Sequence, residues 1–288
     1  MSSHSRVFAV VNQKGGVGKT TSAVNLTACF AASERATLLI DLDPQANASS
    51  AYGATDAARY PQVYDALLGN CVMKDAVMAT ELRHLHLVPS GQDLVGAEIE
   101  LVSVLERERR LERALADLRD DYEIIMIDCP PSLGILTLNA LTAADAVLIP
   151  MQCEYYALEG LARLLETIEL VRGGLNPRLE IGGIMLTMVD TRNNLARQVE
   201  AEVRAHFGDV VFRTRIPRNV RVSEAPSHGK PILLYDIHSR GAVAYLELAE
   251  EIQAGLDLRD PPLAPPPLSA FNPANDSTGK ESSDGDPT

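Results

Sequence analysis

Short apolar runs alternate with amphipathic segments along most of this chain. The apolar runs predict strands near residues 7–11, 36–41, 84–88, 123–128, 145–150, 181–187 and 210–213. Between them, apolar residues at helical spacing predict helices at 19–32, 107–119, 133–142, 158–173, 193–206 and 240–255. Because strands that alternate with helices form βαβ units, we expect an α/β fold: a mainly parallel twisted sheet with helices on both faces.

The alternation stops near residue 257. Residues 257–288 contain seven of the 17 prolines, and six acidic residues against two basic ones. Few apolar side chains there can offset the entropy of ordering the chain. We therefore expect one folded domain over residues 1–256 and a Pro-rich, acidic, disordered tail over 257–288.

Composition narrows the class of protein. With 46% hydrophobic residues the chain can fill a sizeable core, yet no run reaches the roughly 18 apolar residues of a membrane span. Residues 1–6 lack the apolar core of a signal peptide, so a cytoplasmic location is expected. The cysteines show no CxxC spacing and lie in apolar surroundings, which favours reduced, buried thiols over a metal site or disulfides at Cys29, Cys71, Cys129 and Cys153.

A glycine-rich stretch, Lys14-Gly-Gly-Val-Gly-Lys-Thr-Thr21, joins the first predicted strand to the first predicted helix. Glycines let backbone N–H groups turn around an anion, and the helix that follows presents its positive end. Lys19 and the Thr20 hydroxyl can reach a terminal phosphate and Mg²⁺. The stretch therefore predicts a P-loop that binds ATP and Mg²⁺ through Lys14, Gly15, Gly16, Val17, Gly18, Lys19, Thr20 and Thr21.

This loop departs from the usual P-loop pattern, which would place a glycine where the chain has Gln13 and has no lysine at position 14. A lysine so early in the loop lies far from the γ-phosphate of its own chain. We therefore expect Lys14 to reach a nucleotide that is held by a second copy.

Carboxylates follow two of the predicted strands. Asp41 and Asp43 are two residues apart, a spacing that places both on one side of an extended chain. One can bind the waters of Mg²⁺ while the other positions the attacking water, although two acids before a proline can also simply cap a turn. Asp128 ends the run Ile124–Ile127 as a Walker B aspartate near Mg²⁺ does. The loop Ser132–Gly134 can sense the γ-phosphate or serve only as a rigid turn.

Four motifs together resemble the ParA/Soj partitioning ATPases, which carry the deviant Walker A loop of the ParA/MinD class. The similarity runs from about residue 6 to 255 and is carried by Asn12–Thr21, Asp41–Gln45, Gln152–Gly160 and Ile216–Gly229. It implies weak intrinsic ATP hydrolysis to ADP and phosphate by a P-loop ATPase domain. It also implies DNA segregation by an ATP-bound sandwich homodimer, which releases DNA when a ParB/Spo0J-like centromere-binding protein stimulates hydrolysis. A nucleoid-associated location follows from the same resemblance.

The resemblance also assigns roles to matching residues. Gly15 would pack at the dimer interface, Lys14 would contact the phosphates of the partner subunit, and Lys19 and Thr20 would bind γ-phosphate and Mg²⁺. Asp43 would support hydrolysis. Two further residues, after the last predicted strand, would border the adenine: Pro217 and Asn219.

The net charge of −13 disfavours nucleic acid, but the charge is unevenly distributed. Residues 192–240 contain nine Lys/Arg against five Asp/Glu. Within this segment, the resemblance implies nonspecific contacts to double-stranded DNA from Arg192 and Arg221, with Arg218 and Lys230 as further candidates. Any single arginine is as readily solvated or paired with an acid, so the prediction concerns the cluster.

Three other functions fit parts of the sequence. A MinD-like positioning ATPase would bind membrane through a C-terminal amphipathic helix, whereas this C-terminus is acidic and would be repelled by an anionic surface. A metabolic P-loop ligase of the dethiobiotin-synthetase kind would need a substrate pocket that the sequence does not reveal. An iron–sulfur reductase would need a cysteine pair, for which Cys129 alone is a weak start.

Overall fold

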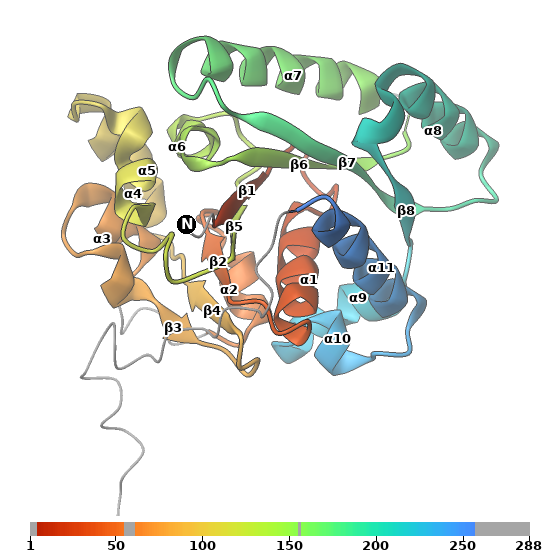
Figure 1. Cartoon of the computed structure of the whole chain (residues 1–288), viewed down its shortest axis with the longest axis horizontal. Coiled ribbons are helices and arrows are strands. Elements are labelled where there is room, and N and C mark those ends of the chain that lie inside the picture. Colours follow the sequence, from red (N-terminus) through yellow and green to blue (C-terminus); the bar gives the residue numbers. More distant parts are fainter. Residues whose placement is uncertain (1–4, 55–60, 155–156, 257–288) are drawn as a thin grey trace, which may run out of the picture.

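One eight-stranded sheet organises this computed structural model, which describes residues 5–54, 61–154 and 157–256 (Figure 1). The strands lie in the order β3-β4-β2-β5-β1-β6-β7-β8, and all neighbours are parallel except β3 and β4. In chain order they are β1 (Arg6–Val10), β2 (Thr37–Asp41), β3 (Met78–Ala79), β4 (Leu85–Val88), β5 (Ile124–Asp128), β6 (Ala146–Gln152), β7 (Glu180–Val189) and β8 (Val211–Pro217).

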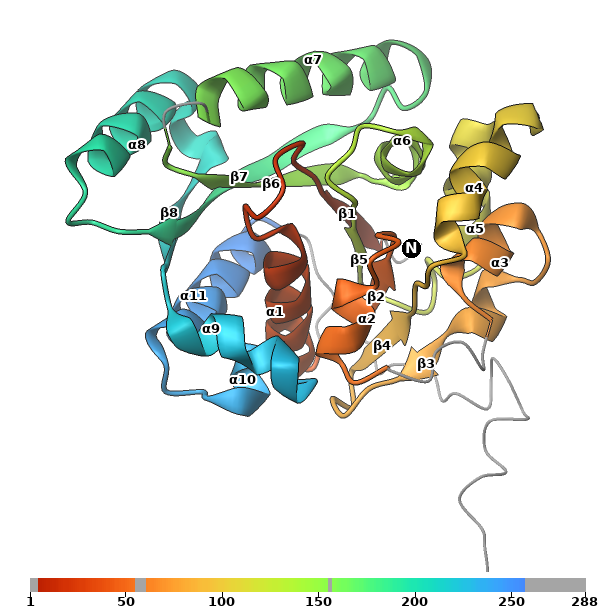
Figure 2. The same ribbon diagram turned by 180° about the vertical axis from the view of Figure 1, so that it is seen from behind.

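Helices cover both faces of the sheet, as the opposite views of Figures 1 and 2 show. They are α1 (Lys19–Ala32), α2 (Asn47–Ala51), α3 (Val63–Leu68), α4 (Leu94–Glu100), α5 (Arg110–Leu115), α6 (Ile135–Ala143), α7 (Ala157–Gly174), α8 (Asn194–Phe207), α9 (Val220–Glu224), α10 (Ile232–Tyr235) and α11 (Arg240–Ala254).

Successive side chains of each strand point to opposite faces of the sheet, so the core is divided into two layers, one on each face. Val7 and Ala9 of β1 pack in one cluster with α3 to α8, whereas Phe8 and Val10 pack in the other with α1, α2 and α9 to α11. Burial on both faces explains why the strands read as continuous apolar runs. The predicted α/β class with a mainly parallel sheet is confirmed.

Each of the seven predicted strands corresponds to an observed strand within a few residues, and the six predicted helices are also found. The predicted helix at 107–119 is wrong in extent: a 3₁₀ turn, Arg107–Arg109, precedes α5, which ends at Leu115. The sequence also missed β3, α2, α3, α4, α9 and α10. These have two to seven residues each, too few for a clear period.

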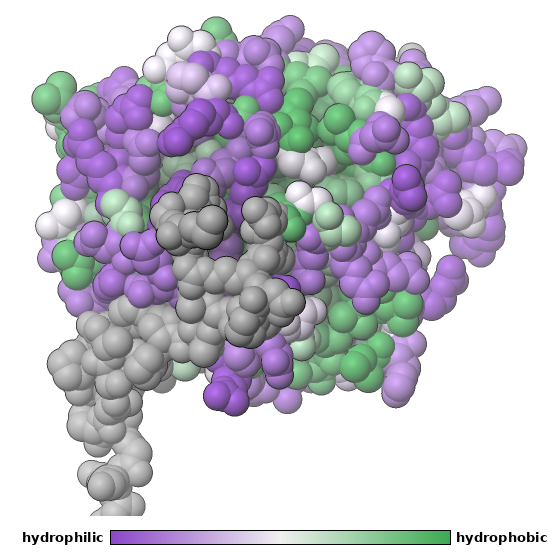
Figure 3. Space-filling model, viewed as in Figure 1, coloured by the Kyte–Doolittle hydropathy of each residue, from purple (hydrophilic) through white to green (hydrophobic). Residues whose placement is uncertain are grey.

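The predicted tail, 257–288, lies outside the described residues. Among the residues that the structure describes, no helix has both the length and the apolar character needed to cross a bilayer. Figure 3 shows a surface on which polar residues predominate, with apolar ones gathered in the region of α7 and again near α10 and α11.

Candidate active site and nucleic-acid interface

Three parallel strands end side by side at the carboxyl edge of the sheet. The register pairs Val10 of β1 and Asp41 of β2 with the same residue of β5, Asp128. The glycine-rich loop follows β1, and Asp43 follows β2. The structure therefore brings the predicted phosphate-binding loop and all three predicted carboxylates to one edge, where ligands bind in open α/β sheets.

The glycine-rich loop needs two of its glycines for backbone reasons. Gly16 and Gly18 have φ values of 76° and 89°, and Gly18 is the residue that precedes the first turn of α1. One side chain of β6 and one of β7 donate hydrogen bonds to backbone carbonyls of the loop. Gln152 Nε2 donates to the Gly16 carbonyl at 2.9 Å, and Thr187 Oγ1 donates to the Val17 carbonyl at 2.8 Å. The loop conformation is thus fixed by contacts to the sheet.

Lys19, the first residue of α1, is only 7% exposed. Its Nζ lies 3.3 Å from the Lys14 carbonyl oxygen, to which it donates. Burial lowers the pKa of Lys19, while the nearby carboxylates of Asp128 and Asp43 raise it. A partly desolvated cation beside a glycine-rich loop is suited to binding a phosphate oxygen.

Asp128 is fully buried, and neither carboxylate oxygen accepts a hydrogen bond from the described residues. Burial raises the pKa of Asp128 most, and the neighbouring Asp41 raises it further. The Thr20 hydroxyl is near enough to lower this pKa, although it is not placed for a well-formed hydrogen bond. A buried carboxylate with no partner calls for a cation or its bound water.

Asp41 differs from Asp128, although the two are neighbours across the strands. Its carboxylate accepts hydrogen bonds from the Ser49 amide at 2.8 Å, the Ser49 hydroxyl at 2.7 Å and the Asp43 amide at 3.2 Å. Ser49 in turn accepts from the Ser90 amide at 3.0 Å. Asp41 therefore ties α2 and the segment after β4 to the end of β2, and its predicted role near Mg²⁺ stays a prediction.

The residues fit Mg²⁺ bound together with a nucleotide. No group of three or more His, Cys, Asp or Glu side chains in the described part of the chain forms a cage for a metal. Mg²⁺ needs no such cage, because it typically takes one or two protein oxygens and completes its shell with water and substrate phosphates. Thr20 and Asp128 would hold it here. Asp43 is 6% exposed, and one of its oxygens accepts from the Gln45 amide at 2.9 Å.

Lys14 and Gly15 lie at the surface of the same loop. The Lys14 ammonium forms an ion pair with Glu154, and the two side chains are 46% and 50% exposed. A Cβ added at Gly15 would meet no atom within 4 Å. Nothing within the described part of the chain therefore requires a glycine at position 15.

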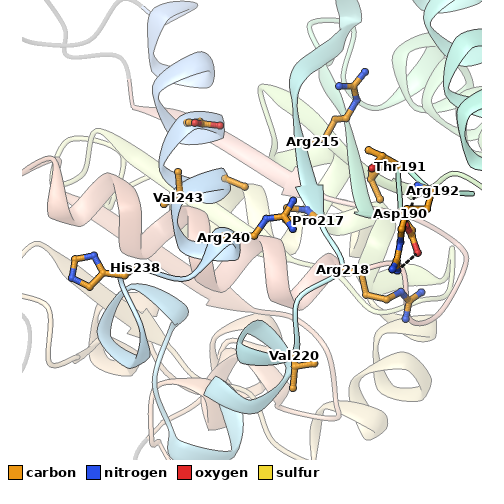
Figure 4. Close-up of a pocket in the computed structure, with 13 residues that line it drawn as sticks. Asp190, Thr191, Arg192, Arg215, Pro217, Arg218, Val220, His238, Arg240 and Val243 are labelled. Atoms are coloured by element: carbon orange, nitrogen blue, oxygen red, sulfur yellow. Dashed lines mark hydrogen bonds and ion pairs between the residues drawn. The ribbon is translucent and has the colours of Figure 1, made fainter.

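A second feature lies beside β7 and β8, where they end next to the start of α11. A cavity of about 830 Å³ opens there, and its walls include Pro217 and several arginines (Figure 4). Figure 4 shows Arg192 turned onto Asp190, with Arg218 and Arg240 on other sides of the cavity. The fold thus brings arginines from distant parts of the chain together beside a residue that was predicted to border the adenine.

Comparison with known proteins decides the family. A family model described as an AAA domain matches residues 5–181. The chain is 55% identical to the chromosome partitioning protein ParA of Myxococcus xanthus over 260 residues, which is 90% of each chain. It is also 55% identical to the sporulation initiation inhibitor protein Soj of Bacillus subtilis, over 86% of this chain and 98% of that one. The chain belongs to the ParA/Soj family.

A solved structure shares the fold of this ParA/Soj chain. The Mycobacterium smegmatis protein titled cobyrinic acid a,c-diamide synthase, with bound ADP and magnesium, superposes with a TM-score of 0.74 at 39% identity. The match covers 85% of this chain and 93% of that one. A related protein of the same fold therefore binds a nucleotide and magnesium, which supports a nucleotide site in this family member.

The structure gives most of the predicted DNA contacts an acidic partner. Arg192 donates two hydrogen bonds of 2.9 Å to Asp190, yet its side chain remains 89% exposed. Arg221 lies 3.2 Å from Glu224 and 3.7 Å from Asp236, and Lys230 lies 3.7 Å from Glu81. Arg218 is exposed and has no ion pair with another described residue.

The two residues predicted to border the adenine have different surroundings. Pro217 ends β8 and lines the cavity. Asn219 instead caps α9, and its side-chain oxygen accepts from the Arg221 amide at 2.8 Å. This cap fixes the start of the helix that carries Arg221. The sequence predicted no capping role for Asn219, although an asparagine before a short helix is a common cap.

Sequence reasoning missed several residues that shape the site. Ser49 holds Asp41, Thr187 and Gln152 hold the loop, and Glu154 pairs with Lys14. Gln152 and Glu154 lie within the motif Gln152–Gly160, which was noticed only for its resemblance. Serine, threonine and glutamine carry no local signal of this role, because their partners lie up to 170 residues away.

Proposed function

We propose that this chain is a partitioning ATPase that uses ATP to switch its hold on DNA. The observation that carries the proposal is the unpartnered, buried carboxylate of Asp128 beside Lys19 and Thr20. This arrangement leaves places for a cation and for phosphate oxygens, as phosphoryl transfer requires. The ParA/Soj membership supports DNA as the track and a chromosome, plasmid or similar assembly as the cargo.

Each residue of the site has a distinct task in this proposal. The loop Lys14–Thr21 binds the phosphates of ATP, and Lys19 contacts the γ-phosphate. Thr20 and Asp128 hold Mg²⁺, which neutralises charge on the phosphates when it is bound. Asp43 orients the attacking water, and Pro217 borders the adenine. Hydrolysis yields ADP and phosphate at a low intrinsic rate.

Two exposed residues support a nucleotide-dependent dimer. Among the described residues, the Lys14 ammonium is held only by a surface ion pair with Glu154, which contributes at most about 1 kcal/mol, so the lysine can exchange this partner for a phosphate. Gly15 has open space where a second chain can approach. We infer that ATP closes a two-fold sandwich in which Lys14 of each subunit contacts the nucleotide of the other.

Dimerisation would then make DNA binding strong. The arginines that line the cavity beside β7 and β8 form what we call the basic edge: Arg192, Arg215, Arg218 and Arg240. A dimer presents two such edges, one on each subunit. The second contact becomes intramolecular, so avidity rises without any new residue. Contacts of this kind position a protein on phosphates without reading sequence. Stimulation of hydrolysis by a ParB-like centromere-binding protein would release the dimer from the nucleoid.

A variant that binds ATP without cleaving it tests this proposal. Asp43→Ala removes the residue that orients water while Lys19 and Asp128 remain. We expect the variant to hydrolyse ATP about 100-fold more slowly and to accumulate as a dimer in light scattering with Mg·ATP. The double variant Lys14→Ala, Asp43→Ala is the matched control and should stay monomeric. Wild-type hydrolysis by Asp43→Ala, or a monomer under saturating Mg·ATP, would contradict the proposal.

A further inference from the structure

An exposed apolar surface runs along α4, a helix that has no role in the function proposed above. Three side chains point to solvent along α4 and the 3₁₀ turn η3 (Leu101–Ser103) that continues it, Val95 (56% exposed), Ile99 (75%) and Val102 (64%), and their spacing of three to four residues places them along one side. Leu105 (86%) lies in the turn that follows η3, beyond the extended Val104. We call these four residues the α4 stripe.

Acidic residues predominate around the α4 stripe. Residues 93–108 contain five carboxylates and one arginine, Arg107, which donates to the Val102 carbonyl at 2.7 Å and pairs with Glu108. Asp93, Glu98 and Glu100 form no ion pair with a described residue, although Glu100 accepts a hydrogen bond from the Tyr64 hydroxyl at 3.0 Å. An apolar strip with an acidic border is complementary to an amphipathic helix that carries lysine or arginine beside its apolar face.

The α4 stripe is coupled to the active site through Glu98. A Cβ built on Gly134 would lie 2.9 Å from Glu98 Oε1 and 3.6 Å from Ser132 Oγ. The α4 carboxylate therefore packs directly on the loop that follows Asp128, for which the sequence left open a role in sensing the γ-phosphate or a role as a rigid turn. A ligand that shifts α4 would press on this loop.

The stripe and the basic edge lie at opposite ends of the sheet. α4 follows β4, next to the β3 edge, whereas Arg192 and Arg218 follow β7 and β8 at the other edge. Figure 2 shows α4 and α8 on opposite sides of the molecule. A protein bound at the stripe would leave the basic edge free for DNA.

We propose that the α4 stripe is the docking surface for a basic amphipathic helix of the partner that stimulates hydrolysis. This inference rests on the proposed function and names the surface and the chemistry of the contact. A second copy of this chain is a poorer occupant, because stripes paired by two-fold symmetry would bring the acidic borders together. Docked basic residues would pair with Asp93, Glu98 and Glu100, and the motion of Glu98 would reach the loop at Gly134.

The test uses the full chain and the ParB-like protein of the same cells. Ile99→Ser is compared with Leu170→Ser, which changes an equally exposed side chain on α7 (77% against 75%). We expect Ile99→Ser to raise the partner concentration for half-maximal stimulation about tenfold, with basal hydrolysis and ATP-dependent dimerisation unchanged. Leu170→Ser should match wild type. Equal half-maximal concentrations in both variants would overturn the docking surface.

A second arm separates this inference from the proposed function. A photo-crosslinking residue placed at position 99 should form an adduct with the ParB-like protein, and one at position 170 should not. If that protein fails to stimulate wild-type hydrolysis, the proposed release step is wrong, and the adduct still decides the docking surface. An adduct between two copies of the chain, no adduct at position 99, or loss of the dimer in Ile99→Ser would overturn the inference.

Discussion

Gly15 and Gly16 are adjacent, yet different physical reasons account for the two glycines. Gly16 has a φ of 76°, which a residue with a Cβ adopts only at a cost of about 1–2 kcal/mol. Gly15 has no positive φ, and a Cβ there would meet no atom within 4 Å. Contacts within the single chain therefore do not explain a glycine at position 15, whereas the close approach of a second chain in the proposed dimer would explain it.

A valine at position 15 tests this explanation. We expect Gly15→Val to keep the thermal midpoint of wild type, because the added atoms meet no atom of the chain within 4 Å. The variant should fail to dimerise with Mg·ATP, as measured by light scattering. Gly16→Val is the control and should lower the thermal midpoint through backbone strain. A Gly15→Val chain that dimerises normally would place the subunit contact elsewhere.

At the scale of elements, a buried histidine on β4 makes stability depend on pH. His86 Nδ1 lies 2.7 Å from the Tyr122 hydroxyl, and burial lowers the pKa of His86 to about 4. The unfolded chain binds a proton near pH 6.5, whereas the folded chain resists it. The stabilisation by neutral His86 is therefore complete above pH 6.5 and is lost as the pH falls toward 4. The loss amounts to about 3 kcal/mol.

Urea unfolding at pH 7 and pH 4.5 measures this effect. The free energy of unfolding of wild type should fall between these two pH values by more than that of His86→Gln, which cannot titrate. Carboxylates contribute equally to both proteins, so the difference isolates the histidine. An identical fall in the two proteins would show that His86 does not couple folding to protonation.

The sequence predicted long elements well and short ones poorly. The strands that deliver Asp41 and Asp128 are buried apolar runs, and α1 follows a glycine-rich signal, so their positions could be derived locally. α2 and α4 have five and seven residues and show no full period. Their places depend on distant contacts such as that of Ser49 with Asp41. For this reason, the α4 stripe could not be predicted from the sequence.

The candidate site likewise contains residues that the sequence predicted from local patterns and residue pairs that it could not predict. The chemistry of Lys19, Thr20 and Asp128 could be read from spacing, because the loop and the strand end are each local patterns. The pairing of Lys14 with Glu154 joins residues 140 positions apart. Asp190 and Glu224 lie within three residues of Arg192 and Arg221, yet spacing alone does not say that they pair. Counting charges along the sequence located the basic edge, but it did not reveal that acidic side chains pair with some of its arginines.

At the scale of the whole molecule, the proposed DNA contacts follow from the uneven distribution of charge. Arg192→Glu should weaken the binding of a DNA duplex about tenfold or more in the presence of Mg·ATP, since each dimer carries the change twice. The slope of log affinity against log salt should become shallower by about 2 for the two lost contacts. The affinity is measured by fluorescence anisotropy, and dimerisation should be unaffected.

Arg178→Glu is the matched control for this prediction. It makes the same change in charge at an exposed arginine that lies in a different cavity, beside Arg6 and Glu180. Its DNA affinity should stay close to wild type. Equal losses in the two variants would mean that total charge governs binding, and that the basic edge has no special role.

The most direct test of the central claim, that ATP switches the hold on DNA, is one titration. The full chain is titrated with a labelled duplex in the presence of Mg·ADP, Mg·ATP or a non-hydrolysable ATP analogue, each at two salt concentrations. The account predicts tight binding with ATP and the analogue, weak binding with ADP, and a steep loss of affinity at the higher salt concentration. Equal affinity in ADP and in the analogue would contradict it.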